Sequence, residues 1–218
     1  MCCCWCWAFS PPACTRCWPC NAATAIGVAS GWGIAGRQQT PVDKRASLRG
    51  VVNYVGLQIG WLACALGAAR GYPWVGLLVV AGHLVIHLLW TQNRRREIVF
   101  LLLVALLGTA VDSAQKAGGL LNYASDAPWP WLAPLWITAM WVLFATALTT
   151  SLRWLQGRVW LAAALGAVFG PLSYVAGERL DGIGFNYGFW FTVLAMGVIW
   201  AVAMAGLAVL AKALVSDR

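Results

Sequence analysis

Six long runs of apolar residues dominate the chain between residues 51 and 215. None of them contains Asp, Glu, Lys or Arg, and the five longer ones span residues 51–69, 72–93, 127–152, 159–177 and 182–211. The remaining run, residues 98–111, is shorter and is followed by Asp112. A helix needs about 20 apolar residues to cross the roughly 30 Å hydrocarbon core of a bilayer. The pattern therefore predicts an all-α polytopic integral membrane bundle of about six transmembrane helices, formed by residues 51–218 as one domain.

Composition supports this class and narrows the partners. Apolar residues make up 61% of the chain and charged residues 10%, against about a quarter in a typical soluble domain. The net charge of +8 is spread over short connecting segments and does not form one basic face. Membrane topology explains such a distribution better than nucleic-acid binding does, so we expect a lipid bilayer and no nucleic acid as partner.

The first fifty residues differ from the rest. Seven of the eight cysteines lie within residues 1–20, and the spacing of Cys14, Cys17 and Cys20 is compatible with part of an iron–sulfur or zinc site. A fourth ligand at suitable spacing is missing, and residues 21–50 show no apolar periodicity. We interpret residues 1–50 as a non-native extension upstream of a true start near Val51. A disordered native tail and a metal site are the alternatives. We expect no cofactor and no metal.

The charges also predict an orientation. If the N-terminal side is cytoplasmic, the inner segments carry eleven basic residues: Arg37, Lys44, Arg45, Arg49, Arg94, Arg95, Arg96, Arg153, Arg158, Lys212 and Arg218. The outer segments then carry three, namely Arg70, Lys116 and Arg179. Because basic residues concentrate on the cytoplasmic side, both termini are predicted in the cytoplasm. We expect a multi-pass protein of the bacterial inner membrane.

Two histidines are the sharpest polar feature of the predicted spans. His83 and His87 are four residues apart, so they share one helix face about 6 Å apart. Gln58 is expected at the same depth on the first span and is a possible partner. Hydrogen bonds to neighbouring helices are the commoner role for such residues, and substrate contact or a proton relay is the alternative. A metal site lacks further ligands, since the first two spans contain no acidic residue.

A second polar group is predicted at the outer side. Asp112 ends the third run and Lys116 follows four residues later, which favours an ion pair on one helix face. Tyr174 and Glu178 follow Pro171 at the outer end of the fifth run. These four residues could line one outward-facing polar pocket, because ionisable groups at membrane depth are often functional. Solvated loop charges are the alternative.

Small residues and prolines predict how the helices meet. Gly56 with Gly60, and Gly166 with Gly170, form two GxxxG patterns that favour close approach of helices. The segment 118–134 is the longest connection between spans and contains Pro128 and Pro130. Because proline disfavours a regular helix interior, we expect an interfacial lid or a re-entrant segment there.

Three segments resemble an uncharacterised bacterial inner-membrane family, domain of unknown function 2878. They are Asn53–Trp61, Pro130–Trp136 and Gly166–Gly177, and the resemblance covers about residues 51–210. It implies a membrane bundle and brings no activity, ligand or catalytic residue. The loose association of the family with lipid-modifying enzymes keeps that chemistry open.

Function remains divided among three classes. The chain has no P-loop, no GxSxG, no HExxH and no dinucleotide glycine pattern. We favour a protein that binds or transports a small or lipid-like molecule, with substrate-binding candidates Gln58, His83, His87, Asp112, Lys116, Tyr174 and Glu178. A membrane enzyme of lipid modification and a structural partner of other membrane proteins are the alternatives. A homo-oligomer is expected for so small a transporter.

Overall fold

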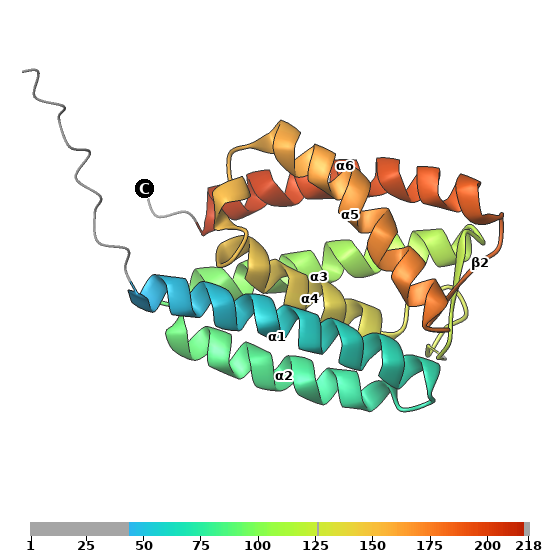
Figure 1. The fold of residues 1–218 in the computed structure, drawn as a ribbon, viewed down its shortest axis with the longest axis horizontal. Helices are drawn as coiled ribbons and strands as arrows, with labels where there is room; N and C mark the ends of the chain where they lie inside the picture. The colour runs from blue at the N-terminus through green and yellow to red at the C-terminus, as the bar shows by residue number, and fades with distance from the viewer. Residues whose placement is uncertain (1–43, 126, 216–218) are drawn as a thin grey trace, which may run out of the picture. The chain divides into compact units, whose positions relative to one another are not determined.

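The computed structural model describes residues 44–125 and 127–215, with side chains from Ser47 onward. Within these ranges the chain forms six α-helices, one short 3-10 helix and two strands (Figure 1). The helices are α1 (Lys44–Ala69), α2 (Pro73–Trp90), α3 (Arg94–Ala117), α4 (Leu135–Thr149), α5 (Val159–Arg179) and α6 (Phe189–Leu214). The 3-10 helix η1 covers Arg153–Leu155, and the strands are β1 (Leu121–Tyr123) and β2 (Ile183–Phe185).

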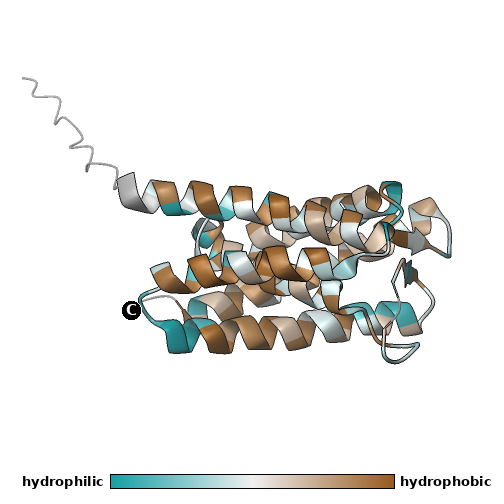
Figure 2. Ribbon diagram, turned by 90° about the horizontal axis from the view of Figure 1, so that it is seen from below, coloured by the Kyte–Doolittle hydropathy of each residue, from teal (hydrophilic) through white to brown (hydrophobic). Residues whose placement is uncertain are grey.

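Five of these helices are long and apolar enough to cross a membrane: α1 from Ser47, α2, α3, α5 and α6. Figure 2 shows apolar residues along the helices and hydrophilic residues gathered toward their ends and connections. A bilayer leaves few alternatives to helices for a spanning segment, because every backbone polar group must be satisfied internally. The prediction of an all-α membrane bundle is confirmed.

The lengths predicted for the third and fourth helices are wrong. We expected the third to be short and the fourth to be long, whereas α3 has 24 residues and α4 has 15. α3 extends beyond its apolar run because its buried acids, Glu97 and Asp112, both accept hydrogen bonds from other helices. α4 begins only at Leu135 because the prolines before it, ending with Pro134, disfavour a helix.

α4 lies at the centre of the helix packing. It contacts α1 and α2 on one side and α3 on another, and it also touches α6. At 15 residues it is about 22 Å long, shorter than a hydrocarbon core. Eight of its residues are buried, among them Trp136, Trp141 and Thr146. α4 is therefore enclosed by other helices instead of facing lipid along its length.

Both predicted GxxxG patterns lie at close helix contacts. A Cβ added to Gly56 would collide with the imidazole of His83, and one added to Gly60 would collide with Leu143. At Gly166 and Gly170 an added Cβ would collide with Trp200 of α6. Glycine thus permits α1 to approach α2 and α4, and α5 to approach α6.

A small sheet joins two connections that are far apart in sequence. β1 and β2 are antiparallel, with Leu121 opposite Phe185 and Tyr123 opposite Ile183. The sheet was not predicted, because strands of three residues are too short to show a period in the sequence. In Figure 1 it lies at the end of the bundle where α3 and α5 finish.

Two ends of the bundle can now be named. The strand end holds β1 and β2; the terminal end is where α1, α3 and α5 begin and α2, α4 and α6 finish (Figure 1). The interpretation of residues 1–50 as an extension, including the cysteines, concerns residues that lie mostly outside the described ranges. It stays a prediction.

Candidate functional site

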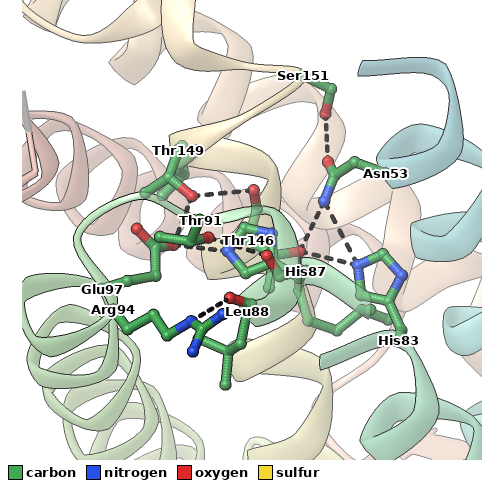
Figure 3. Close-up of polar contacts among 12 residues, drawn as sticks. Asn53, His83, His87, Leu88, Thr91, Arg94, Glu97, Thr146, Thr149 and Ser151 are labelled. Atoms are coloured by element: carbon green, nitrogen blue, oxygen red, sulfur yellow. Dashed lines mark hydrogen bonds and ion pairs between the residues drawn. The ribbon is translucent and has the colours of Figure 1, made fainter. Parts of the chain in front are cut away.

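The predicted histidines lie in a polar network at the terminal end. His83 Nε2 is 3.2 Å from Thr146 Oγ1 and 3.4 Å from Asn53 Nδ2 (Figure 3). Asn53 Nδ2 also donates to Thr146 Oγ1 at 2.9 Å. The Thr146 hydroxyl itself donates to the carbonyl of Leu143, so it can only accept from the other two. This arrangement favours the His83 tautomer that carries its proton on Nε2.

The second histidine is paired with an acid. His87 Nε2 lies 2.8 Å from Glu97 Oε1, and both side chains are more than nine-tenths buried. Thr149 Oγ1 donates to the same carboxylate oxygen at 2.7 Å. The two imidazole rings stack with centroids 6.5 Å apart, as expected for positions four apart on a helix. α2 thus presents both rings to α1, α3 and α4.

Local sequence explains how Glu97 reaches His87. α2 ends at Trp90 and α3 begins at Arg94, with Asn93 as its N-cap. Asn93 Oδ1 accepts from the backbone N–H of Arg96, which satisfies one of the free donors at the helix start. The tight connection returns the chain so that the first turn of α3 lies against the last turns of α2.

A cavity of about 550 Å³ opens beside this network. It lies among α1, the α2–α3 connection, the end of α4 and η1. Its polar and charged lining consists of Arg49, Asn53, His83, His87, Thr91, Gln92, Asn93, Glu97, Thr149, Thr150 and Arg153, and Val52, Ile86, Trp90 and Val215 complete the wall. Its size is in the range of small-molecule sites.

Gln58 does not join the histidines. It lies exposed on α1 and does not line the cavity. Asn53, more than one helical turn earlier on α1, lies beside His83, where we predicted Gln58. Depth counted along a helix does not fix which way a side chain points, and the Gln58 side chain is exposed and makes no hydrogen bond to the histidines.

A second polar cluster surrounds Asp112 near the strand end. Asp112 has no exposed surface. Its Oδ1 accepts from Tyr123 Oη at 2.7 Å and Tyr174 Oη at 2.6 Å, and its Oδ2 accepts from Trp141 Nε1 at 2.5 Å. The carboxylate therefore connects α3, β1, α4 and α5.

The predicted outward pocket is divided in the structure. Asp112 and Tyr174 are joined directly, as expected. Lys116 instead donates to the carbonyl of Leu132 at 2.9 Å. Glu178 is half-buried and makes no hydrogen bond or ion pair with the other three among the described residues. Asp112 is enclosed by aromatic donors, so these four side chains do not line one open pocket.

Tyr123 is the member of this cluster that lies outside the spanning helices. Burial raises its pKa well above the usual value, and the nearby Asp112 carboxylate and their hydrogen bond raise it further. The phenol therefore stays protonated and keeps donating to Asp112. Gln115, three residues after Asp112 on α3, is also buried, and its Oε1 lacks a partner among the described residues.

The sequence prediction missed several members of the cavity network. Asn53, Glu97, Thr146 and Thr149 were not among the predicted site residues. Glu97 follows three arginines, and this part of the sequence was interpreted only as a marker of topology. Glu97 could have been predicted as a partner of His87 from its position, because it lies ten residues after His87 at the start of the next helix. The threonines gave no comparable signal. No group of three or more potential metal ligands occurs in the described part of the chain.

One comparison with known proteins found a match. The family described as protein of unknown function DUF2878 matches residues 50–206. No match was found among curated proteins or among solved structures.

Proposed function

Because the chain belongs to the family of proteins of unknown function DUF2878, which has no assigned activity, we propose a function from the cavity: this protein binds a small or lipid-like molecule that carries an anionic group. The observation that supports it is a cavity of about 550 Å³ with a largely polar lining in an otherwise apolar bundle. Buried polar groups in a membrane protein are costly and are most often functional.

The charges of the lining favour an anion. Arg49 and Arg153 lie on the wall, and the single acid of the lining, Glu97, is already engaged by His87 and Thr149. The lining offers further donors, among them the Asn53 amide. Trp90 and Ile86 supply apolar surface beside the polar groups. A phosphate or carboxylate with an attached apolar portion would match both kinds of surface.

The proposed orientation of the protein in the membrane determines from which side the ligand enters the cavity. The excess of basic residues at the terminal end supports our proposal that this end lies on the cytoplasmic side of a bacterial inner membrane. The ligand would then enter from the cytoplasm or from the inner leaflet. Transport across the membrane is an extension of this binding role, as is a homo-oligomer.

The His87–Glu97 pair favours a second candidate, a membrane enzyme of lipid modification. A carboxylate that orients an imidazole is a common acid–base arrangement, and here the pair lines a cavity. Chemical change of a bound lipid, detected by mass spectrometry, would separate an enzyme from a binding protein.

Ligand-induced stabilisation tests the proposal. We would follow thermal unfolding of the purified protein by tryptophan fluorescence with inorganic phosphate, glycerol 3-phosphate or dioctanoylphosphatidic acid. A ligand that binds only the folded state raises the unfolding midpoint. We expect saturable stabilisation by at least one probe. Stabilisation by the lipid alone would indicate a headgroup ligand, and equal stabilisation by all three would indicate the free anion.

Variants link the effect to the cavity. Arg49→Gln should weaken binding by about tenfold or more, which corresponds to roughly 1.4 kcal/mol, because it removes a positive charge from the lining. Gln58→Leu is the matched control, because Gln58 is exposed on the same helix as Arg49 but outside the cavity. No stabilisation by any probe, or equal binding by all variants, would refute the proposal.

A further inference from the structure

A second depression lies beside the cavity, between the start of α3 and the end of α6. It has a volume of about 350 Å³ and is lined by Asn93, Arg95, Arg96, Val99 and Leu214. Asn93 also lines the cavity, so the two hollows are neighbours. We call this second hollow the α3–α6 groove.

The arginines of the α3–α6 groove have no acidic partner among the residues that the structure describes. Arg95 and Arg96 are exposed, and their side chains form no hydrogen bond or ion pair within the described ranges, whereas the neighbouring Arg94 donates to the carbonyl of Leu88. Glu97 is the sole acid described at the terminal end, and it is buried against His87 and Thr149. Within residues 44–125 and 127–215, these two positive charges are therefore without a partner and can attract an external anion.

The apolar part of the groove lies further along α3, toward the middle of this apolar helix. Val99 lies one helical turn deeper along α3 than Arg95, and it is 43% exposed. Leu214 forms the facing wall from the last residue of α6. A lipid placed here would have its phosphate at the arginines, at the depth where headgroups lie, and its acyl chain along the apolar wall.

We propose that the α3–α6 groove is a binding site for an anionic phospholipid of the surrounding bilayer, held through its phosphate by Arg95 and Arg96 and through an acyl chain by Val99 and Leu214. Juxtamembrane basic residues attract anionic lipids by this electrostatic mechanism. The groove adds a fixed apolar wall that a general surface charge lacks. The site uses its own side chains and does not depend on what the cavity binds.

Native mass spectrometry tests the site. The purified protein would be equilibrated with equal amounts of dioleoylphosphatidylglycerol and dioleoylphosphatidylethanolamine, which share acyl chains and differ in headgroup charge. The native chain should retain phosphatidylglycerol preferentially. Arg95→Gln/Arg96→Gln should reduce that preference by about fivefold per arginine, the effect of one basic side chain at an anionic surface. Arg95→Lys/Arg96→Lys should keep most of it.

Two further variants separate this site from general charge. Arg158→Gln/Lys212→Gln removes the same charge from the terminal end but lies outside the groove, and it should retain the preference. Val99→Trp keeps both arginines and fills the apolar part, so it should reduce retention. An unchanged preference in Arg95→Gln/Arg96→Gln, an equal loss in the Arg158/Lys212 control, or full retention in Val99→Trp would each overturn the proposal.

The same measurement distinguishes the groove from the cavity. In a chain that carries Arg49→Gln in the cavity, Arg95→Gln/Arg96→Gln should still lower the preference for phosphatidylglycerol by the same factor, because Arg49 does not line the groove. Failure of the cavity proposal would therefore leave this result intact, and failure of the groove would leave the cavity titration intact.

Discussion

The buried side chains of His87 and Glu97 stabilise each other, so each depends on the presence of the other. Both are more than nine-tenths buried, and Thr149 donates to the carboxylate as well. Removal of one member of a buried pair leaves the other without compensation, whereas removal of both is often tolerated. Leucine at position 87 alone would therefore leave Glu97 without its imidazole.

A double-mutant cycle measures this dependence. Glu97→Leu alone should lower the free energy of unfolding by about 3–5 kcal/mol, the usual cost of breaking a buried pair. His87→Leu/Glu97→Leu should cost less than the sum of the two single changes, with a coupling of about 0.5–3 kcal/mol. Denaturant unfolding in detergent micelles gives these values. Strictly additive effects would show that the two residues act independently.

Asp112 accepts hydrogen bonds from three donors, so the loss of stability on replacing it should depend on how many of these bonds the new side chain can still accept. Asp112→Leu removes the acceptor of Tyr123, Tyr174 and Trp141, at about 1–3 kcal/mol for each buried donor left without a partner. Asp112→Asn keeps one oxygen acceptor and should cost less. Thermal unfolding midpoints should fall in the order native, Asn, Leu. Equal midpoints for native and Leu chains would contradict the role of this cluster.

The raised pKa of Tyr123 predicts that the protein loses stability at alkaline pH. Its folded-state pKa lies well above the usual value of about 10, so the folded protein holds a proton that the unfolded chain releases. The contribution is complete below pH 10 and declines as the pH rises toward the folded-state pKa. Tyr123→Phe should lessen the decline in unfolding free energy above pH 10. An identical pH profile for both proteins would argue against it.

At the scale of elements, the sequence predicted helices well where lipid imposes their length. The runs 51–69, 72–93 and 159–177 correspond to α1, α2 and α5 because an apolar segment in a bilayer must satisfy its own backbone. The run 182–211 contains most of α6, but it begins seven residues too early and includes β2. The sequence predicted α3 and α4 poorly because their limits depend on tertiary contacts. The bonds of Asp112 and Glu97 form across helices, and no periodicity records them.

The candidate site could likewise be predicted only where a single helix determines its geometry. His83 and His87 were found because a helix alone brings them together. Their partners Asn53, Thr146 and Glu97 come from three other helices, and helix rotation, which selects Asn53 over Gln58, is set by packing. Gly56 contributes to that choice, since its missing Cβ leaves room for the His83 ring.

The contact between α5 and α6 yields a test at this scale. Pro171 leaves the carbonyl of Ala167 without an N–H of its own helix, and Gly197 of α6 lies close to that oxygen. Gly166 lies against the backbone of Trp200, where an added Cβ would collide. Close approach of glycine faces contributes strongly to helix association in lipid.

Gly166→Ala should therefore separate α5 from α6 and destabilise the bundle by about 1–3 kcal/mol, the usual range for overpacking. Gly206→Ala is the matched control on α6, because an added Cβ there meets nothing within 4 Å. The control should be neutral or stabilise by about 0.5–1 kcal/mol, since alanine favours a helix interior. Unfolding in detergent compares the two, and equal destabilisation would refute the assignment of the contact.

At the scale of the whole molecule, the two polar clusters lie toward opposite ends of the bundle. The cavity network lies toward the terminal end, and the Asp112 cluster lies toward the strand end, where Tyr123 of β1 covers it. α3 connects them, since Glu97 is near its start and Asp112 near its finish. One end thus opens into a polar cavity, while the Asp112 cluster toward the other end is enclosed.

Which end faces the cytoplasm follows from charge and can be measured. From residue 94 onward, seven basic residues belong to the terminal end or the C-terminal segment, and Lys116 and Arg179 belong to the strand end. The excess predicts a cytoplasmic terminal end. Reporter fusions after Arg96, Gln156 and Arg218 should report cytoplasm, and one after Ser125 should report periplasm. The short α4 makes Gln156 the critical position: a periplasmic signal there would mean that α4 does not cross, and one after Arg96 would reverse the orientation and turn the cavity toward the periplasm.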